Sequence, residues 1–285
     1  MIPSSTPGRA VVLCADDFAL SESVSLAIAE LACGGRLGAV SAMTAGAGWP
    51  RAWSLLPEIP DRVSVGLHVN LVEGRALSDA KPFPSAANLA ALELCGRLRR
   101  DELAAEIDAQ WTAFEDHAGR GPDFVDAHQH VHLLTTVREA LLEVVAKRGG
   151  RVPVRSLWPA VGPRDSFAKR MAFRLLGSKA LARRLDMLGL AANRAFGGLQ
   201  AFDAPQAVQR DWAALLGVLP DNALVACHPA RTAEPGDPIG PFRLAEYRWL
   251  GSQDFTAASR AAGIDWVAGP RARPASPTGT SAHLA

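Results

Sequence analysis

Three of the seven histidines stand at alternate positions directly after a short apolar run, in the segment Phe124-Val125-Asp126-Ala127-His128-Gln129-His130-Val131-His132. Residues two apart share one face of a β-strand, so a strand here would let His128, His130 and His132 converge on one point. Imidazole is the commonest protein ligand for metal ions. A polar loop can show the same pattern, and a single strand histidine is more often a hydrogen-bonded core residue. Further ligands are therefore needed elsewhere in the chain.

Ionisable residues also follow other apolar runs of strand length. They are Asp16 and Asp17 after the first run, His68 after the third, Asp126 and His128 after the fourth, and His228 after a late one. Parallel β/α barrels build their active sites at the C-terminal ends of the strands, so these groups would meet at one rim. An aspartate after a strand often only caps the next helix. Four strand ends that each carry an ionisable group favour a metal-dependent hydrolase.

The residue types at this rim divide into distinct chemical roles. A catalytic divalent ion needs about three protein ligands and an open position, and Asp17, His68 and His128 supply one carboxylate and two imidazoles. Asp16 can take a proton from the attacking water, and His228 can donate one to a leaving group. We expect one divalent ion per chain, Mg²⁺ or Zn²⁺ first, with Mn²⁺ or Co²⁺ also compatible with the ligand set.

An alternation of apolar runs and helical patterns predicts the elements that position these residues. Strands are expected at 10–15, 39–43, 63–67, 124–127, 152–157 and 224–227, and helices at 21–31, 101–117, 136–148 and 205–216. Such β/α alternation predicts a parallel sheet closed into a barrel. No Gly-, Ser- and Pro-rich linker divides the chain. We therefore expect one α/β barrel domain over residues 1–269, with a helical insertion at about 160–200 and a disordered tail at 270–285.

Composition narrows the class of partner. The chain has 285 residues with 30 basic against 29 acidic side chains, a formal net charge of +1 that would not recruit nucleic acid. Its four cysteines are far apart and form no Cys-x-x-Cys pair, which argues against a zinc knuckle and a disulfide framework. No export signal and no apolar run of about 20 residues is visible. We expect a cytoplasmic protein with a small, neutral partner and no membrane span; a homodimer stays open.

Four blocks of the sequence carry a family resemblance. They are Ala15-Asp16-Asp17-Phe18, Gly66-Leu67-His68-Val69-Asn70-Leu71-Val72-Glu73-Gly74, Asp126-Ala127-His128-Gln129-His130-Val131-His132 and Cys227-His228-Pro229. In this order they resemble the signature blocks of the YdjC-like carbohydrate deacetylases. The resemblance spans residues 11 to 268. It implies a distorted (β/α) barrel related to polysaccharide deacetylases, and metal-dependent removal of an acetyl group from an N-acetylated amino sugar such as diacetylchitobiose.

The resemblance also implies roles for individual residues. By motif position it gives the metal ligands Asp17, His68 and His128, the general base Asp16, the acid His228, and a basic residue near the substrate, Arg155. It leaves His130 and His132 to support the site, to bind substrate or to pack at the rim. Ala19 and Ala127 depart from the family pattern, which has glycine and serine there. Ala19 would be costly if the backbone needs a positive φ.

Alternatives remain open at this point. The first alternative is a deacetylase that acts on an N-acetylglucosaminyl hopanoid-type lipid. The second is a metal-dependent phosphoesterase. A non-catalytic sugar-binding barrel would not need both Asp16 and His228. Trp49, Trp53 and Trp158 are candidates for stacking on sugar rings, although a tryptophan is more often core. No Gly-x-Ser-x-Gly elbow or phosphate-binding Gly-rich loop is present. The basic stretches at 167–176 and 179–188 are predicted to be solvated helix faces.

Overall fold

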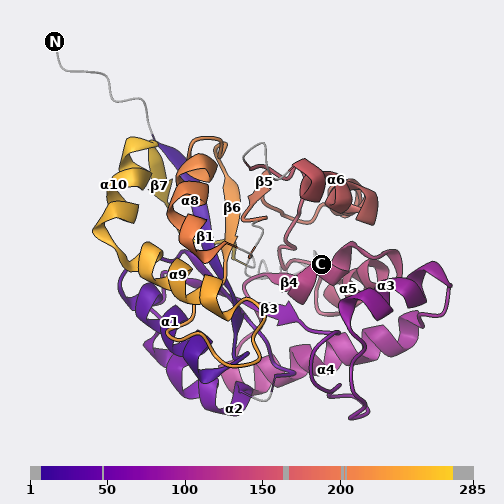
Figure 1. The fold of residues 1–285 in the computed structure, drawn as a ribbon. Helices are drawn as coiled ribbons and strands as arrows, with labels where there is room; N and C mark the ends of the chain where they lie inside the picture. The colour runs from indigo at the N-terminus through magenta and orange to yellow at the C-terminus, as the bar shows by residue number, and fades with distance from the viewer. Residues whose placement is uncertain (1–7, 47, 163–166, 200–201, 203, 272–285) are drawn as a thin grey trace, which may run out of the picture.

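The strand β1 (Arg9–Phe18) lies at the centre of the fold and pairs with three neighbours. The computed structural model describes residues 8–46, 48–162, 167–199, 202 and 204–271. Within these ranges seven strands form one sheet in the order β4-β3-β2-β1-β6-β5, with β7 paired to the start of β1 (Figure 1). The other strands are β2 (Ala39–Ala42), β3 (Ser64–Val69), β4 (Val125–Ala127), β5 (Ala195–Gly197), β6 (Ala223–Cys227) and β7 (Ile264–Trp266). All their pairings are parallel, as predicted.

Residues 153–161 connect the two edges of this sheet. Two isolated parallel bridges, Val125–Val154 and Ala160–Phe196, join the segment to β4 on one side and to β5 on the other. The segment takes the place of a strand, so the curled sheet is a distorted β/α barrel, as predicted. The strand expected at 152–157 does not form as a regular element. Pro153 and Pro159 lack the amide hydrogen that a strand ladder uses, which limits the pairing to single bridges.

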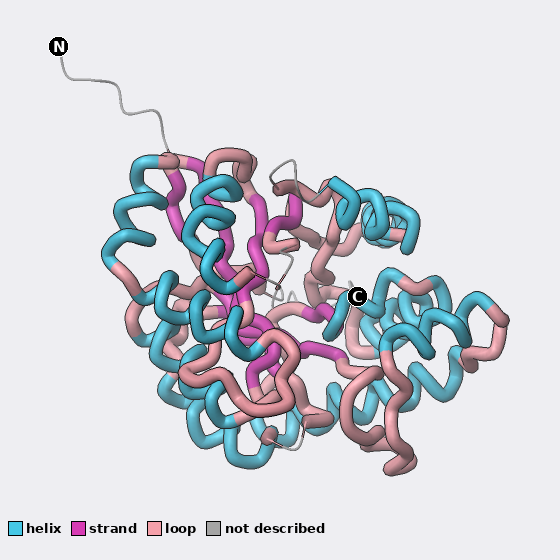
Figure 2. Tube along the Cα trace, in the orientation of Figure 1, coloured by secondary structure: helices cyan, strands magenta, loops and turns pink. Residues whose placement is uncertain are grey.

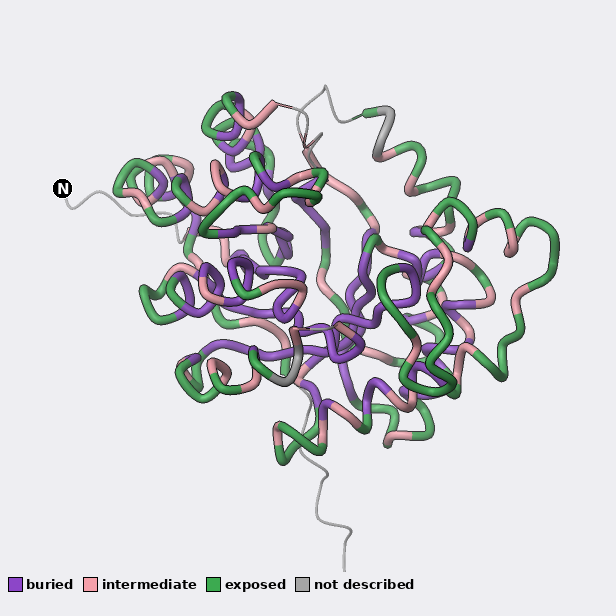
Figure 3. The backbone as a smooth tube through the Cα atoms, turned by 60° about the horizontal axis from the view of Figure 1, so that its bottom comes forward, coloured by how far each residue is buried: buried purple, intermediate pink, exposed green. Residues whose placement is uncertain are grey.

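Helices surround the strands (Figure 2). They are α1 (Glu22–Cys33), α2 (Trp49–Ala52), α3 (Ala86–Leu94), α4 (Arg100–Ala118), α5 (Thr135–Lys147), α6 (Phe167–Leu176), α7 (Ser178–Leu188), α8 (Val208–Leu216), α9 (Gly240–Gly251) and α10 (Gln253–Ala261). Among the described residues, short 3-10 helices accompany them: η1 (Trp53–Glu58), η2 (His128–Leu133) and η4 (Pro205–Ala207). Strands β2 to β6 are buried at every position (Figure 3). In a β/α barrel the helices cover the outer face of the sheet, and the curled strands enclose its inner face.

The first two long helices form where their sequence patterns predict. Ser21 caps α1, because its hydroxyl oxygen accepts a hydrogen bond from the Val24 amide at 3.3 Å. In α4, Ile107, Trp111 and Phe114 recur at helical spacing and are all buried. Both helices therefore bury the apolar face that their sequences predict.

Other elements were not predicted. Strands β5 and β7 have three residues each, which is too few to show a hydrophobic period. Helix α9 buries Arg243 and Glu246, whose charges make this stretch look like a solvent-exposed helix face in the sequence.

Helices α6 and α7 lie in the sequence between the bridging segment and β5. Most of the predicted disordered tail, residues 272–285, lies outside the described part of the chain. Among the described helices, none has the length and apolar content needed to cross a membrane.

Candidate metal centre

The C-terminal end of β1 brings two adjacent carboxylates to one cavity. The register between β1 and β2 shifts between Ala15 and Phe18, and Asp17 has a φ of 68°. Neighbouring residues of a regular strand face opposite ways, so this irregularity is what lets Asp16 and Asp17 both line the cavity. Ala19 follows with a φ of 75°, the left-handed conformation that glycine adopts without cost.

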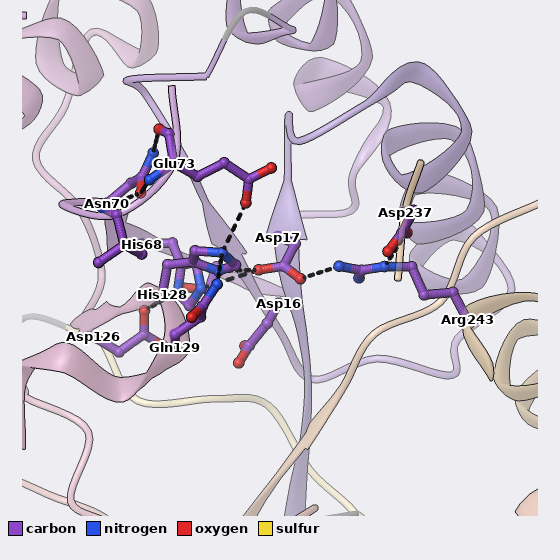
Figure 4. A network of polar contacts seen from close by, with 12 residues as sticks. Asp16, Asp17, His68, Asn70, Glu73, Asp126, His128, Gln129, Asp237 and Arg243 are labelled. Carbon is purple, nitrogen blue, oxygen red and sulfur yellow. Dashed lines mark hydrogen bonds and ion pairs between the residues drawn. The ribbon is translucent and has the colours of Figure 1, made fainter. Parts of the chain in front are cut away.

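Asp17 meets two histidines from two other strand ends. Its Oδ1 lies 2.8 Å from His128 Nδ1 and 3.3 Å from His68 Nε2 (Figure 4). The three side chains are buried, and one donor atom from each lies within 4.8 Å of the others. The structure thus brings together the three residues predicted as metal ligands.

The surroundings of His68 fit a metal ligand. Its Nδ1 lies 2.5 Å from Asp126 Oδ1 and 3.0 Å from Ser41 Oγ, which leaves Nε2 directed toward Asp17. A ligating histidine commonly has its second ring nitrogen held by a carboxylate in this way. Burial alone would lower the pKa of His68, but the charge of Asp126 raises it to about 10. The site therefore favours positive charge, which a divalent cation can supply.

A second group of potential metal ligands forms ion pairs with an arginine of the protein. Cys14, Asp16 and Asp126 also bring donor atoms within 4.8 Å of one another. Arg155 lies among them, with Nη1–Asp16 Oδ2 and Nη2–Asp16 Oδ1 distances of 2.6 Å and an Nη2–Asp126 Oδ2 distance of 2.5 Å. Its guanidinium already pairs with both carboxylates, so we take the group around Asp17 as the candidate metal site.

Arg155 itself does not line the cavity. Its side chain is completely buried beneath Asp16. The family resemblance implies a position near the substrate; in the structure Arg155 fixes the carboxylate of Asp16, which lines the cavity. Asp126, quoted in the histidine block without a role, joins Arg155 to His68.

Sequence reasoning missed a second arginine, which comes from α9. Arg243 Nη2 lies 2.8 Å from Asp17 Oδ2, and its Nε donates to Asp237 Oδ2 at 2.8 Å (Figure 4). Burial raises the pKa of Asp17, but the charges of His128 and Arg243 hold it well below its usual range. Arg243 thus keeps Asp17 ionised and engages the oxygen that does not face the histidines. No spacing signal connects Arg243 to the first strand.

The turn after β3 places another carboxylate at the site. Asn70 Oδ1 accepts hydrogen bonds from the amides of Val72 and Glu73 at 3.1 and 3.0 Å, which fixes this turn. Glu73 Oε2 then lies 3.2 Å from His128 Nε2. Glu73 belongs to the block that carried the family resemblance, so its position could have been suspected from the sequence.

The prediction that His128, His130 and His132 share a strand face is wrong. Strand β4 ends at Ala127, and the chain then turns through η2, where Gln129 and His130 have φ values of 49° and 57°. His130 lines the cavity, with its ring centroid 5.2 Å from that of Phe173. His132 is buried at a centroid distance of 6.4 Å from His130, and burial lowers its pKa to about 4. Only His128 of the three contacts Asp17.

His228 lies on the wall of the same cavity, which has a volume of about 630 Å³. Its backbone N–H donates to Glu246 Oε2 at 2.5 Å, and its ring meets that of Phe202 at 5.2 Å. Burial lowers the pKa of His228 to about 4, so the imidazole is neutral near pH 7. The neighbouring Cys227 Sγ donates to the Cys14 carbonyl at 3.5 Å, away from the cavity, and burial raises its thiol pKa.

The tryptophans predicted as sugar platforms do not line this cavity where they are described. The Trp53 ring packs against His117 with a centroid distance of 5.7 Å. Trp158 lies beneath Arg174 and Lys179, each 5.6 Å from its ring. The side chain of Trp49 lies outside the described part of the structure. Phe173 and Phe202 supply the aromatic wall instead.

Comparison with known sequences places this chain in a protein family. The family model described as YdjC-like protein matches residues 10–261. A chitooligosaccharide deacetylase of Enterobacter sp. (strain 638) is 30% identical over 145 residues, which cover 50% of this chain and 57% of that protein. A human carbohydrate deacetylase is 29% identical over 169 residues, covering 55% of this chain and 52% of that protein. The match thus spans little more than half the length of these relatives.

Two solved structures share the fold. One is described as a candidate cellobiose-phosphate cleavage protein of Enterococcus faecalis V583, with a TM-score of 0.65 at 16% identity over 92% of this chain and 97% of that chain. The other is a lactam utilization protein of Thermus thermophilus, with a TM-score of 0.51 at 17% identity over 91% and 99%. At these identities the likeness is one of fold alone.

Proposed function

Because the chain belongs to the YdjC-like protein family, we propose that it is a metal-dependent hydrolase that removes the acetyl group from an N-acetylated amino sugar. One observation carries the proposal. A carboxylate and two imidazoles converge at the wall of a cavity that Asp16 and His228 also line. Amide hydrolysis needs charge stabilisation on the carbonyl oxygen, an activated water and protonation of the departing amine, and these residues can provide all three.

Asp17, His68 and His128 would hold the divalent ion. When bound, such an ion polarises the carbonyl of the acetyl group and lowers the pKa of water. The remaining chemistry belongs to the side chains of the protein. Asp16 takes a proton from the attacking water. Although Arg155 occupies both oxygens of Asp16, each carboxylate oxygen keeps a second lone pair for the water. Arg155 also fixes the direction in which that carboxylate faces.

His228 completes the reaction as a proton relay. Because its pKa is about 4, the His228 imidazole is unprotonated at neutral pH. We therefore assign to it the transfer of the proton that Asp16 has taken from water to the nitrogen of the amide. The C–N bond then breaks, and the products are acetate and the free amine. This scheme balances protons, because the proton that leaves the attacking water ends on the departing amine.

The cavity favours a small substrate. Its volume of about 630 Å³ falls within the range of about 300–1,000 Å³ that is common for small-molecule sites. Apolar side chains on one wall, Phe173, Leu199 and Phe202, offer surfaces for the face of a sugar ring. Short chitooligosaccharides such as diacetylchitobiose are the substrates we propose.

The test is an assay of three products. The metal-loaded protein is incubated with diacetylchitobiose, N-acetylglucosamine and a phosphate monoester, and acetate, free amine and phosphate are measured separately. We expect equal amounts of acetate and amine from the disaccharide, lost in Asp16→Asn and kept in Asp254→Asn, an exposed aspartate of α10. Phosphate without acetate would instead indicate a phosphoesterase. Sugar binding without any product would indicate a non-catalytic barrel, and acetate only from a lipid-linked N-acetylglucosaminyl substrate would select that alternative.

A further inference from the structure

The two helices α6 and α7 concentrate the positive charge of the chain. Residues 167–188 hold six basic side chains and one acidic side chain, a formal net charge of +5. From totals of 30 basic and 29 acidic residues, this leaves 24 basic and 28 acidic residues in the rest of the chain. A near-neutral protein thus carries one strongly basic segment and is acidic elsewhere in its sequence.

The same helices carry most of the exposed apolar surface. Six of the ten large apolar side chains that are exposed in the described part of the chain belong to α6 and α7. On α6, Phe167, Met171 and Leu175 recur every four residues and are all exposed, so they form one stripe that faces solvent. Leu175 is 81% exposed and Met187 on α7 is 78% exposed. A solvated polar face, as the sequence predicted, does not account for this stripe.

The helix pair is anchored to the rest of the fold beside the cavity. On α7, Ser178, Leu181 and Leu185 are buried, and Arg184 pairs with Glu139 of α5 at 3.1 Å. On α6, Ala172 and Phe173 line the cavity. The exposed apolar stripe and the wall of the site are therefore parts of one helix.

We propose that α6 and α7 form a docking surface for the headgroup region of an anionic bilayer. An amphipathic helix with basic side chains beside an exposed apolar stripe matches the two attractions that such a surface offers, apolar burial and anionic headgroups. Docking on this face places α6, whose Ala172 and Phe173 line the cavity, against the bilayer. The proposal concerns binding and does not depend on the reaction at the cavity.

Other occupants match only part of this surface. A nucleic acid would use the basic charge but leave the stripe of Phe167, Met171 and Leu175 without a partner. A symmetric dimer through this face would bring together two segments that each have a formal net charge of +5. The terminal segments 1–7 and 272–285 contain no acidic residue that would complement it.

The test is co-sedimentation of the full chain with lipid vesicles. We expect binding to vesicles of phosphatidylglycerol and phosphatidylcholine, weakening with salt, and little binding to phosphatidylcholine alone. The double variant Leu175→Glu, Met187→Glu should bind at least about tenfold more weakly, because it adds negative charge to the exposed apolar surface of α6 and α7. Arg183→Gln should lose about fivefold. Val218→Glu, at another exposed apolar position that follows α8, is the matched control and should bind like the parent chain.

Thermal unfolding establishes that each variant is folded, and sedimentation velocity without vesicles reports the oligomeric state. Equal binding to both vesicle types, or full binding by the double variant, would overturn the proposal. So would a dimer that the double variant abolishes while vesicles bind nothing, or binding of duplex DNA that depends on Arg183 and not on Leu175. Acetate release from a soluble sugar is measured in parallel, and its loss or retention bears on the proposed reaction alone.

Discussion

Arg155 holds both carboxylate oxygens of Asp16, with two nitrogen–oxygen distances of 2.6 Å. Both side chains are buried, and the same guanidinium reaches Asp126. One cation therefore pairs with two buried carboxylates below the proposed site. This relationship joins the stability of the barrel to the orientation of the proposed base.

Arg155→Gln should destabilise the fold by about 3–5 kcal/mol, because it leaves buried carboxylates without their cation. Arg155→Lys should recover part of that stability but not the turnover, since an ammonium cannot engage both oxygens of Asp16 as a planar fork does. Urea unfolding and acetate release measure the two effects. Arg100→Gln, which breaks an exposed pair with Glu143, is the control and should cost under about 1 kcal/mol. A fully stable Arg155→Gln would contradict the assignment.

The two adjacent aspartates should separate metal binding from catalysis. Asp16→Asn keeps the shape of the side chain but removes the proton acceptor, so turnover should fall by about 10²-fold or more while metal stays bound. Asp17→Asn should lower the affinity of the protein for the metal ion. The double variant His68→Ala, His128→Ala should do the same. Elemental analysis after dialysis, together with acetate release, distinguishes the two outcomes. Full activity of Asp16→Asn with metal bound would mean that another group is the base.

Asp126 should affect the metal without contacting it. Its Oδ1 lies 2.5 Å from His68 Nδ1 and accepts a hydrogen bond from Ser41 Oγ at 2.5 Å. Removing such a support commonly weakens metal affinity by about 10–100-fold. Titration calorimetry of Asp126→Asn with Zn²⁺ measures this loss, and Ser41→Ala should show a smaller one. Unchanged affinity in Asp126→Asn would show that His68 is oriented by its packing alone.

The sequence predicted that the three proposed ligands come together, because parallel strands deliver their C-terminal ends to one rim. Asp17, His68 and His128 each follow an apolar run, and that rule needs no knowledge of loops. The rule failed for His130 and His132, because the strand ends at Ala127 and positive φ angles redirect the chain. Pattern alone cannot locate where a strand of three residues ends.

The charged partners of the site were beyond sequence reasoning for a different reason. Arg243 and Glu246 lie on α9, more than two hundred residues after Asp17, and a buried arginine or glutamate in a helix looks like a solvated face. Only the packing of α9 against the barrel brings Arg243 to Asp17. Arg155 was singled out by resemblance, but its burial against Asp16 depends on the irregular segment that replaces a strand.

Ala19 is a departure from the family pattern whose cost can be measured. Its φ of 75° is strained for a residue with a Cβ atom. Ala19→Gly should therefore stabilise the fold by about 0.5–1 kcal/mol, even though glycine gains entropy in the unfolded chain. Ala27→Gly, at a buried position inside α1, should have the opposite sign, costing about 1 kcal/mol. Denaturant unfolding of both variants measures these two changes in the free energy of unfolding. Destabilisation by Ala19→Gly would show that the backbone at Ala19 is not strained.

Glu246 should make stability depend on pH. Burial raises the pKa of this carboxyl from 4.5 to about 7. The folded chain then holds a proton that the unfolded chain has lost, so this contribution is fully present below about pH 4.5 and is lost as pH rises through about 7. The free energy of unfolding should fall over that window, relative to Glu246→Gln, by on the order of 3 kcal/mol at most.

The difference between parent and variant is the quantity to measure, by urea unfolding at several pH values. Histidines such as His228, whose pKa is lowered to about 4, also change stability in this range, but they are common to both proteins and cancel. Glutamine can accept a hydrogen bond from only one of the two donors, Trp212 Nε1 and the His228 amide, so Glu246→Gln loses one hydrogen bond at every pH. Only the change of the stability difference with pH therefore tests the pKa of Glu246. A difference that stays constant between about pH 5 and pH 8 would mean that Glu246 is ionised throughout. It would then hold the His228 backbone as a charged acceptor, and mutation should lower turnover equally at every pH.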